Sequence, residues 1–284
     1  MILSALAFSI MSLLVKVVSE YGISILEVVA VRSIISLVIS GFTLKHKGIA
    51  PFGNRKLLLF SRGLVGFIAL NCVFYALTSL PLAEATILQY LHPMFTAVLA
   101  IFFLGERSTG GSLICIALSF IGVIIMVQPD VFFTPSLVKL DSFAVLVGIS
   151  GAFLSAIAYI IVRALNKTED PAVIILYFPM ISLPISIILL WQDFVMPSGE
   201  VWFYLVAIGI TTHVGQIAIT KAMQTETASR ATSFGYLQVV FATLLGAVFY
   251  HEVPHSGTLI GAGLIIAGAY INVTWKRKAL QLKD

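Results

Sequence analysis

Charged residues are scarce along this chain. Asp, Glu, Lys and Arg together make up only 11% of its 284 residues, whereas 59% are hydrophobic and the mean hydropathy is +1.04. A soluble domain carries about 25% charged residues. Apolar runs of helix length recur along the whole chain and leave no stretch for a separate soluble domain. The composition therefore predicts an all-α integral membrane protein with several spans.

Cysteine is almost as rare. Cys72 and Cys115 are the only two, and both fall inside apolar runs. This pattern argues against a disulfide framework, and two thiols alone lack the ligand set of a structural zinc site. The sequence also contains no Asp-rich cluster. We therefore expect no metal and no cofactor.

Common catalytic motifs are missing as well. The chain has no Walker A sequence, no HExxH and no G-x-S-x-G, so we do not expect an enzyme or ATP hydrolysis. The spans that would face His92 offer no deep acid, which leaves an intramembrane enzyme as a remote alternative, beside a passive channel. The net charge of +4 sits in loops and tail, so it does not indicate nucleic-acid binding.

What the chain does contain is a series of ten apolar segments. Each is long enough to cross a hydrocarbon core of about 30 Å as a helix. Helix is required because lipid cannot satisfy open backbone N–H and C=O groups. The predicted segments are 2–18, 25–44, 57–78, 82–104, 109–127, 143–165, 171–191, 201–221, 229–250 and 256–275.

The chain also repeats itself. Residues 85–106 and 231–252 align without a gap, at a constant offset of 146 residues. The coinciding pairs are Ala85/Ala231, Thr86/Thr232, Tyr90/Tyr236, Leu91/Leu237, Phe95/Phe241, Leu99/Leu245, Phe103/Phe249, Glu106/Glu252, Gly111/Gly257, Leu113/Leu259, Ile114/Ile260 and Gly122/Gly268. We therefore predict a first five-helix repeat over 1–128, an external linker over 129–142, a second five-helix repeat over 143–275 and a basic tail over 276–284.

The distribution of Lys and Arg predicts the orientation. Basic residues concentrate in one set of alternate loops and in the tail, whereas the opposite loops carry only Lys16 and Lys139. This asymmetry predicts that both termini are cytoplasmic and that the chain lies in the cell (inner) membrane. Because each half has an odd number of spans, the second half enters the membrane from the opposite side. Two inverted five-helix repeats are typical of secondary transporters that work by alternating access.

The segment Tyr75–Arg107, YALTSLPLAEATILQYLHPMFTAVLAIFFLGER, its degenerate copy ending in Glu252, and Glu27 with Arg32 in the second span carry a family resemblance. The chain resembles the EamA family of the drug/metabolite transporter superfamily over nearly its whole length. The resemblance implies ten helices, a central cavity lined by the first four helices of each half, and activity as a small-metabolite carrier, often an exporter. The second copy departs from the first, since Val239 stands in the place of Pro93.

Polar side chains deep in a membrane are costly and need an explanation. On the fourth span, Gln89 or Tyr90 shares a helical face with Pro93, and Tyr236 repeats this position on the ninth span. Pro93 lacks a backbone donor, so it is expected to bend its helix and free a carbonyl. The two tyrosines either face a substrate or bond a neighbouring helix. His92 and His213 either couple transport to protons or pack as hydrogen-bonded residues. The remaining deep amides are Asn71, Gln216 and Gln238.

Arg32 lies well inside its span and needs a partner or a wet cavity. It either binds a carboxylate or phosphate, which a guanidinium grips bidentately, or forms an interhelical ion pair. Arg62 lies near the end of its span and is expected to reach the cytoplasmic surface.

Four further residues are expected to have structural roles. Glu106 and Glu252 each end a helix and are expected to accept hydrogen bonds from the free amides of the helix that follows. Gly257 and Gly261 lie four residues apart and permit a close helix contact, within a monomer or across a homodimer.

The sequence therefore predicts a secondary carrier of a small organic metabolite, an amino acid or a related compound, moved by efflux. An organic-anion exchanger or an uptake carrier of the same fold is the alternative. The expected partners are the small-molecule substrate, the lipid bilayer, and protons or a counter-substrate, with no nucleic acid.

Overall fold

A computed structural model describes residues 1–80, 86, 88–106, 109–127, 141–190, 194–249 and 256–281, and in these ranges the regular structure is entirely helical. The helices are α1 (Ile2–Glu20), α2 (Ile25–Lys47), α3 (Lys56–Ser79), α5 (His92–Leu104), α6 (Gly110–Val127), α7 (Ser142–Leu165), α8 (Pro171–Leu190), α9 (Gly199–Thr225), α10 (Ala228–Ser233), the 3₁₀ turn η2 (Phe234–Tyr236), α11 (Leu237–Phe249) and α12 (Ser256–Gln281).

Each of the ten predicted segments overlaps an observed helix. Within the described residues, seven helical stretches are long and apolar enough to cross a membrane. Three more are apolar but shorter, over His92–Leu104, Gly110–Ile125 and Leu259–Trp275. The chain is therefore a multi-pass membrane protein, and its crossing by ten helices stays a prediction.

Two predicted helices are interrupted, at equivalent positions of the repeat. The segment expected over 82–104 contains a turn at Tyr90 and Leu91, and α5 begins only at His92. The segment expected over 229–250 divides into α10, the 3₁₀ turn η2 and α11. Pro93 explains the first break, because its ring removes one backbone donor at the start of α5. The second copy lacks that proline and changes direction through 3₁₀ geometry instead.

The chain forms two compact units, which we call the first and second unit. Apart from the first two residues, the first unit comprises residues 3–67 and 161–225, and the second comprises 68–160 and 226–284. Each unit combines segments from both halves of the sequence repeat. The packing units and the sequence repeats are therefore different divisions of the chain.

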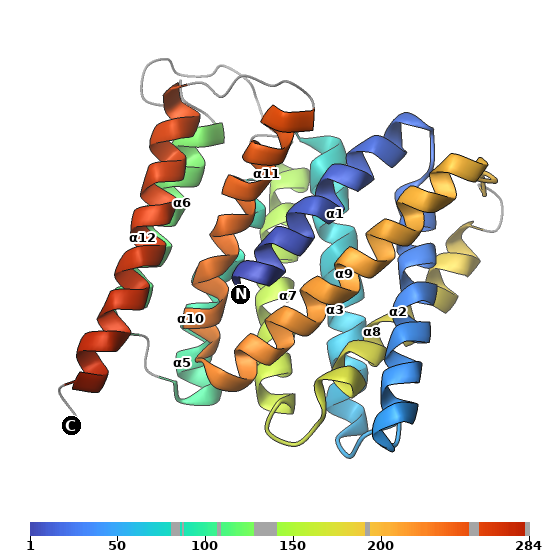
Figure 1. The fold of residues 1–284 in the computed structure, drawn as a ribbon, viewed down its shortest axis with the longest axis horizontal. Helices are drawn as coiled ribbons and strands as arrows, with labels where there is room; N and C mark the ends of the chain where they lie inside the picture. The colour runs from blue at the N-terminus through green and yellow to red at the C-terminus, as the bar shows by residue number, and fades with distance from the viewer. Residues whose placement is uncertain are drawn as a thin grey trace. The chain divides into compact units, whose positions relative to one another are not determined.

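In the first unit, α2 packs along α8 and α9 (Figure 1). Ser24 caps the start of α2 by accepting a hydrogen bond from the Glu27 amide, and Gly48, with a φ of +66°, ends the helix in the left-handed conformation. Small residues keep the helices close. Ser33 and Ser182 join their hydroxyls across α2 and α8 at 2.9 Å, and a Cβ on Gly209 would meet Ile35 at 2.4 Å.

In the second unit, α6 and α12 lie side by side along their length (Figure 1). A Cβ placed on Gly122 would lie 2.6 Å from the carbonyl oxygen of Gly261, and one placed on Gly268 would lie 3.2 Å from that of Cys115. Gly122 matches Gly268, and Cys115 matches Gly261, at the repeat offset of 146 residues. The same close contact is therefore made twice, with the two copies exchanging roles.

Candidate functional site

The first unit contains a small polar cavity of about 20 Å³, which is room for about one water molecule. It is built by α2, α3, α8 and α9, so both halves of the sequence contribute. The described residues that line it are Arg32, Ser33, Ser36, Arg62, Ile175, Phe178, Pro179, Thr212 and Gln216. Two of the predicted site residues, Arg32 and Gln216, therefore meet in one cavity.

Helical spacing explains why these side chains converge. Arg32 and Ser36 lie four residues apart on α2, and Thr212 and Gln216 lie four apart on α9, so each pair occupies one helix face. Pro179 interrupts the hydrogen bonds inside α8. Because it has no N–H, the Ile175 carbonyl one turn earlier loses its usual donor, and both residues lie at the cavity.

Two guanidinium groups share one aromatic ring at this site. The Cζ atom of Arg32 lies 5.1 Å from the centroid of the Phe178 ring, and that of Arg62 lies 5.9 Å from it. These distances are in the range of cation–π contacts. The expectation that Arg62 reaches the surface is wrong, because its side chain is buried with 7% exposure. The sequence could not reveal this, since burial depends on how α8 packs over α3.

Some of the buried polar atoms at the cavity have no hydrogen-bond partner among the described residues. Nε of Arg32 and Oγ1 of Thr212 are among them. A buried donor without a partner costs about 1–3 kcal/mol. Both groups can donate, and no Asp or Glu is among the described lining residues. The cavity therefore presents positive charge and unused donors.

His213 lies beside this cavity and not in its lining. Its Nδ1 atom lies 2.9 Å from the hydroxyl of Ser36, which does line the cavity, and the ring is only 3% exposed. The histidine is thus a hydrogen-bonded neighbour of the site. Neither Ser36 nor Thr212 was singled out from sequence, although their spacing from Arg32 and Gln216 is the signal that could have found them.

A second cluster of predicted residues lies in the second unit. The rings of Tyr90 and Tyr236 stack with centroids 5.6 Å apart, and the ring of His92 lies 5.5 Å from that of Tyr159. The hydroxyl of Tyr236 is fully buried and donates to the backbone carbonyl of Tyr90 at 2.9 Å. The hydroxyl of Tyr236 thus bonds the backbone of a neighbouring segment.

Gln89 contributes its backbone to this cluster. The carbonyl one turn before Pro93 belongs to Gln89, and it accepts a hydrogen bond from Nδ1–H of His92 at 3.0 Å. A carbonyl can only accept, so this contact requires a proton on Nδ1. The freed carbonyl expected from Pro93 is thus taken up by the neighbouring imidazole.

Asn71 and Gln238 lie elsewhere, in α3 and α11 of the second unit, and neither is among the described residues of the cavity. Within the described part of the chain, no three His, Cys, Asp or Glu side chains gather as a metal site would require.

Glu106 lies at a helix start. Gly105, with a φ of +62°, ends α5, and the Glu106 carboxylate accepts a hydrogen bond from the Ala228 amide at 2.8 Å. Ala228 begins α10, a helix far along the chain that the sequence did not indicate. Glu252 lies outside the described residues. Gly257 and Gly261 are both buried in α12, and the Gly261 carbonyl faces Gly122.

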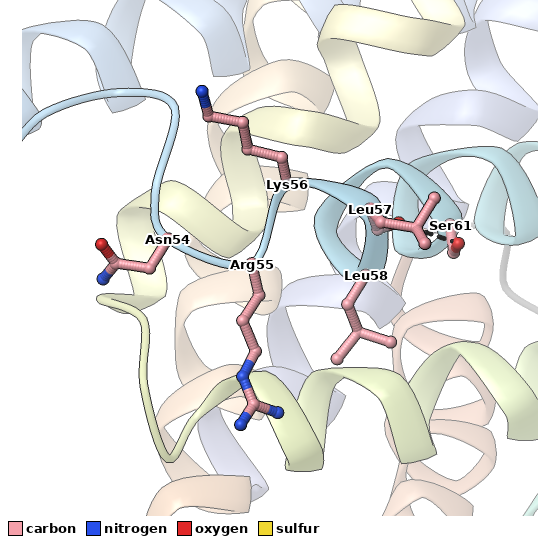
Figure 2. Close-up of a pocket in the computed structure, with 6 residues that line it drawn as sticks. All are labelled: Asn54, Arg55, Lys56, Leu57, Leu58 and Ser61. Atoms are coloured by element: carbon pink, nitrogen blue, oxygen red, sulfur yellow. Dashed lines mark hydrogen bonds between the residues drawn. The ribbon is translucent and has the colours of Figure 1, made fainter.

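A larger hollow of about 520 Å³ lies at the start of α3. Figure 2 shows Asn54 and Arg55 on the loop and Lys56, Leu57, Leu58 and Ser61 on the first turns of the helix, with Arg55 and Lys56 pointing to opposite sides. The Glu169 carboxylate holds this loop by accepting from the amides of Asn54 and Arg55 at 2.9 and 2.8 Å. The polar groups of this loop are exposed or tied to Glu169, so we do not regard it as the functional site.

Comparison with known proteins places this geometry in context. The model of the EamA-like transporter family matches residues 1–128 and 142–274. The pseudopaline exporter CntI of Pseudomonas aeruginosa is 31% identical over 266 residues, which cover 93% of this chain and 91% of the exporter. Solute carrier family 35 member G1 of Mus musculus is 31% identical over 277 residues, covering 93% of this chain and 74% of that protein.

Two more distant similarities agree. An S-adenosylmethionine uptake transporter of Rickettsia felis is 26% identical over 249 residues, covering 87% of this chain and 82% of that transporter. A solved crystal structure superposes with a TM-score of 0.78 over 98% of both chains at 18% sequence identity, which shows a shared fold.

Proposed function

Since this chain belongs to the EamA-like transporter family, we propose that it is a secondary carrier that moves a small organic metabolite across the membrane by alternating access. The observation that carries this proposal is the cavity of the first unit. It is polar and charged, it lies between apolar helices, and its lining comes from α2 and α3 of one half and α8 and α9 of the other. Transporter sites lie where two repeats meet.

Inverted repeats are part of the proposal. Their support is the exchange of roles at the α6–α12 contact, where Gly122 faces Gly261 and Gly268 faces Cys115. Gly268 and Cys115 are the repeat equivalents of Gly122 and Gly261, so one contact is the copy of the other. Such a pair of matching contacts is typical of two copies related by a two-fold axis. An axis in the membrane plane relates two halves that enter the bilayer from opposite sides. The chain would then lie in the inner membrane with both termini in the cytoplasm, as its basic loops indicate.

For the solute, we propose an amino acid or a related compound carried outward. A buried guanidinium suits a carboxylate, and hydroxyl and amide groups suit the polar remainder of such a molecule. Movement outward is supported by the similarity to the pseudopaline exporter CntI, which is 31% identical to this chain. The second candidate is an organic-anion exchanger or uptake carrier, which the two guanidinium groups over Phe178 favour.

Proteoliposomes test the carrier. Purified protein is reconstituted and assayed for saturable uptake and for exchange across a panel of amino acids, organic acids and nucleosides. We expect saturable flux of at least one class, driven by its own gradient, by exchange or by protons. Flux that rises without limit as the solute concentration increases would indicate a channel, and absence of flux across the panel would contradict the proposal.

Accessibility labelling tests the inverted topology. Single cysteines are placed beside Glu106 and beside Glu252 in a background without Cys72 and Cys115, and intact cells are exposed to a membrane-impermeant maleimide. We expect the two positions to react from opposite sides of the membrane. Reaction of both from the same side would rule out the inverted arrangement.

A further inference from the structure

We propose that the cavity of the first unit is an anion clamp, in which Arg32, Arg62 and Thr212 grip a carboxylate or phosphate group of the carried solute. This inference rests on the proposed function and narrows it, because it commits the solute to an acidic group.

Charge is the first argument. The guanidinium groups of Arg32 and Arg62 lie over one Phe178 ring, and no Asp or Glu is among the described lining residues. An aromatic face stabilises a cation by less than the cost of removing its charge from water. Two like charges close together in an apolar setting also repel each other. An anion bound to Arg32 would offset the cost of burying that charge.

Unused donors are the second argument. Nε of Arg32 and Oγ1 of Thr212 are both buried at the cavity and have no partner among the described residues. These two atoms belong to α2 and α9, so they approach the cavity from different helices. An acidic oxygen accepts several hydrogen bonds, which an amide or an alcohol cannot match in number or strength.

The backbone also makes room for the clamp. Gly66 lies one turn after Arg62 on α3, and a Cβ at Gly66 would come within 2.5 Å of Nη1 of Arg62. Any larger residue at this position would push the guanidinium from its present place. The absence of a side chain at Gly66 therefore positions Arg62 against the cavity and Phe178.

The size of the cavity limits what enters. Its volume of about 20 Å³ holds one water-sized group and not a whole metabolite. In this conformation one oxygen of an acidic group fits beside the lining donors, and the rest of a solute does not. The rest of the solute would occupy space that opens during transport, so the clamp selects for the acid and not for the carbon skeleton.

Thermal unfolding of the full chain in a lipid-free detergent micelle tests the clamp. The probes are succinate, citrate and inorganic phosphate, compared with succinamide and with chloride at the same ionic strength. A ligand that binds only the folded state raises the melting temperature. We expect at least one of the three anions to raise it, and succinamide and chloride to leave it unchanged. Equal effects of succinate and succinamide, or no effect of any anion, would overturn the clamp.

Three variants localise the effect. Arg32→Gln should abolish stabilisation by anions, and Thr212→Val should weaken anion binding about tenfold or more, because hydrogen bonds to a charged group are strong. The matched control is Arg55→Gln, which removes an exposed guanidinium of the same unit outside the cavity and should keep the wild-type response. If Arg32→Gln does not fold, the result for Thr212→Val is used in its place. A rise in melting temperature with anions as large as that of the wild type, in the variant that is used, would overturn the clamp.

A lipid phosphate is another source of the same chemistry, so a further arm adds phosphatidylglycerol to the micelle. Stabilisation by this lipid alone would assign the cavity to lipid and overturn the clamp. Transport assays separate the two proposals. A protein that binds anions through Arg32 but moves no solute would contradict the carrier and keep the clamp. A protein that moves a neutral solute with no preference for acids would keep the carrier and contradict the clamp.

Discussion

The hydroxyl of Tyr236 donates a hydrogen bond to the backbone carbonyl of Tyr90, 2.9 Å away, and the two rings stack with centroids 5.6 Å apart. The two tyrosines occupy the same position in the two copies of the repeat, 146 residues apart. Each also lies at the interruption of its helix, where the regular backbone pattern is broken. The Tyr236 side chain, at one interruption, therefore satisfies a backbone carbonyl at the other interruption.

Tyr236→Phe should destabilise the protein by about 0.5–1.5 kcal/mol, the usual net value of one hydrogen bond, because the Tyr90 carbonyl loses its donor. The matched control is Tyr90→Phe, which keeps the stacked ring and leaves the bond to its carbonyl intact. Denaturation by SDS, followed by circular dichroism, measures both. Equal losses of unfolding free energy in the two variants would show that this hydrogen bond does not stabilise the protein.

Gly122→Ala should cost about 1–3 kcal/mol, because the added methyl group would overlap the Gly261 carbonyl, and a backbone atom cannot move aside cheaply. Gly263→Ala is the control on the facing helix, since nothing lies within 4 Å of a Cβ at that position. It should be neutral or slightly stabilising in the same assay, as alanine favours helix. A stable Gly122→Ala protein would contradict the close packing of α6 and α12.

Glu106→Ala should destabilise the second unit by about 0.5–2 kcal/mol, because the Ala228 amide at the start of α10 loses its acceptor. Glu106→Gln keeps an acceptor oxygen and should lose less, with the difference giving the contribution of the charge near the positive end of the helix. The melting temperature in detergent measures both variants. A larger loss in the glutamine variant would contradict the capping role.

Pro93→Ala should slow transport while leaving the protein folded. The new amide would hydrogen-bond the Gln89 carbonyl, displace the imidazole of His92 and extend α5 across its present start. The assay is the initial rate in proteoliposomes, normalised to the amount of reconstituted protein. A rate equal to that of the wild type would show that this interruption has no part in the transport cycle.

Asp170 should make stability depend on pH in the acidic range. Partial burial alone would raise the pKa of its carboxyl, but hydrogen bonds from Lys47 and from the Ala172 amide outweigh burial and leave the pKa below its ordinary value. The group's contribution is present above the unfolded pKa of about 3.9 and is lost as the pH falls through the folded value. In melting curves between pH 7 and 3, Asp170→Asn should lose stability less steeply than the wild type. Parallel curves would contradict this.

Much of the fold follows from the sequence. Scarce charge and continuous apolar runs predict the helices, because in lipid the backbone must satisfy its own hydrogen bonds, and the observed helices overlap all ten predicted segments. The interruption at Pro93 is equally local, since a missing N–H acts within one turn. Helices and the break at Pro93 depend on residues close together in the chain, and the repeat is visible when the sequence is aligned with itself.

The partners of each side chain required the folded chain. Arg62 was expected at the surface and is buried over Phe178, and Glu106 accepts from α10, which the sequence did not indicate. Arg32 and Thr212 meet although 180 residues separate them. Apolar helices show no marked polar stripe, so nothing in their sequences states which faces meet. Small packing differences between helices decide this, and they decide which donors remain without a partner.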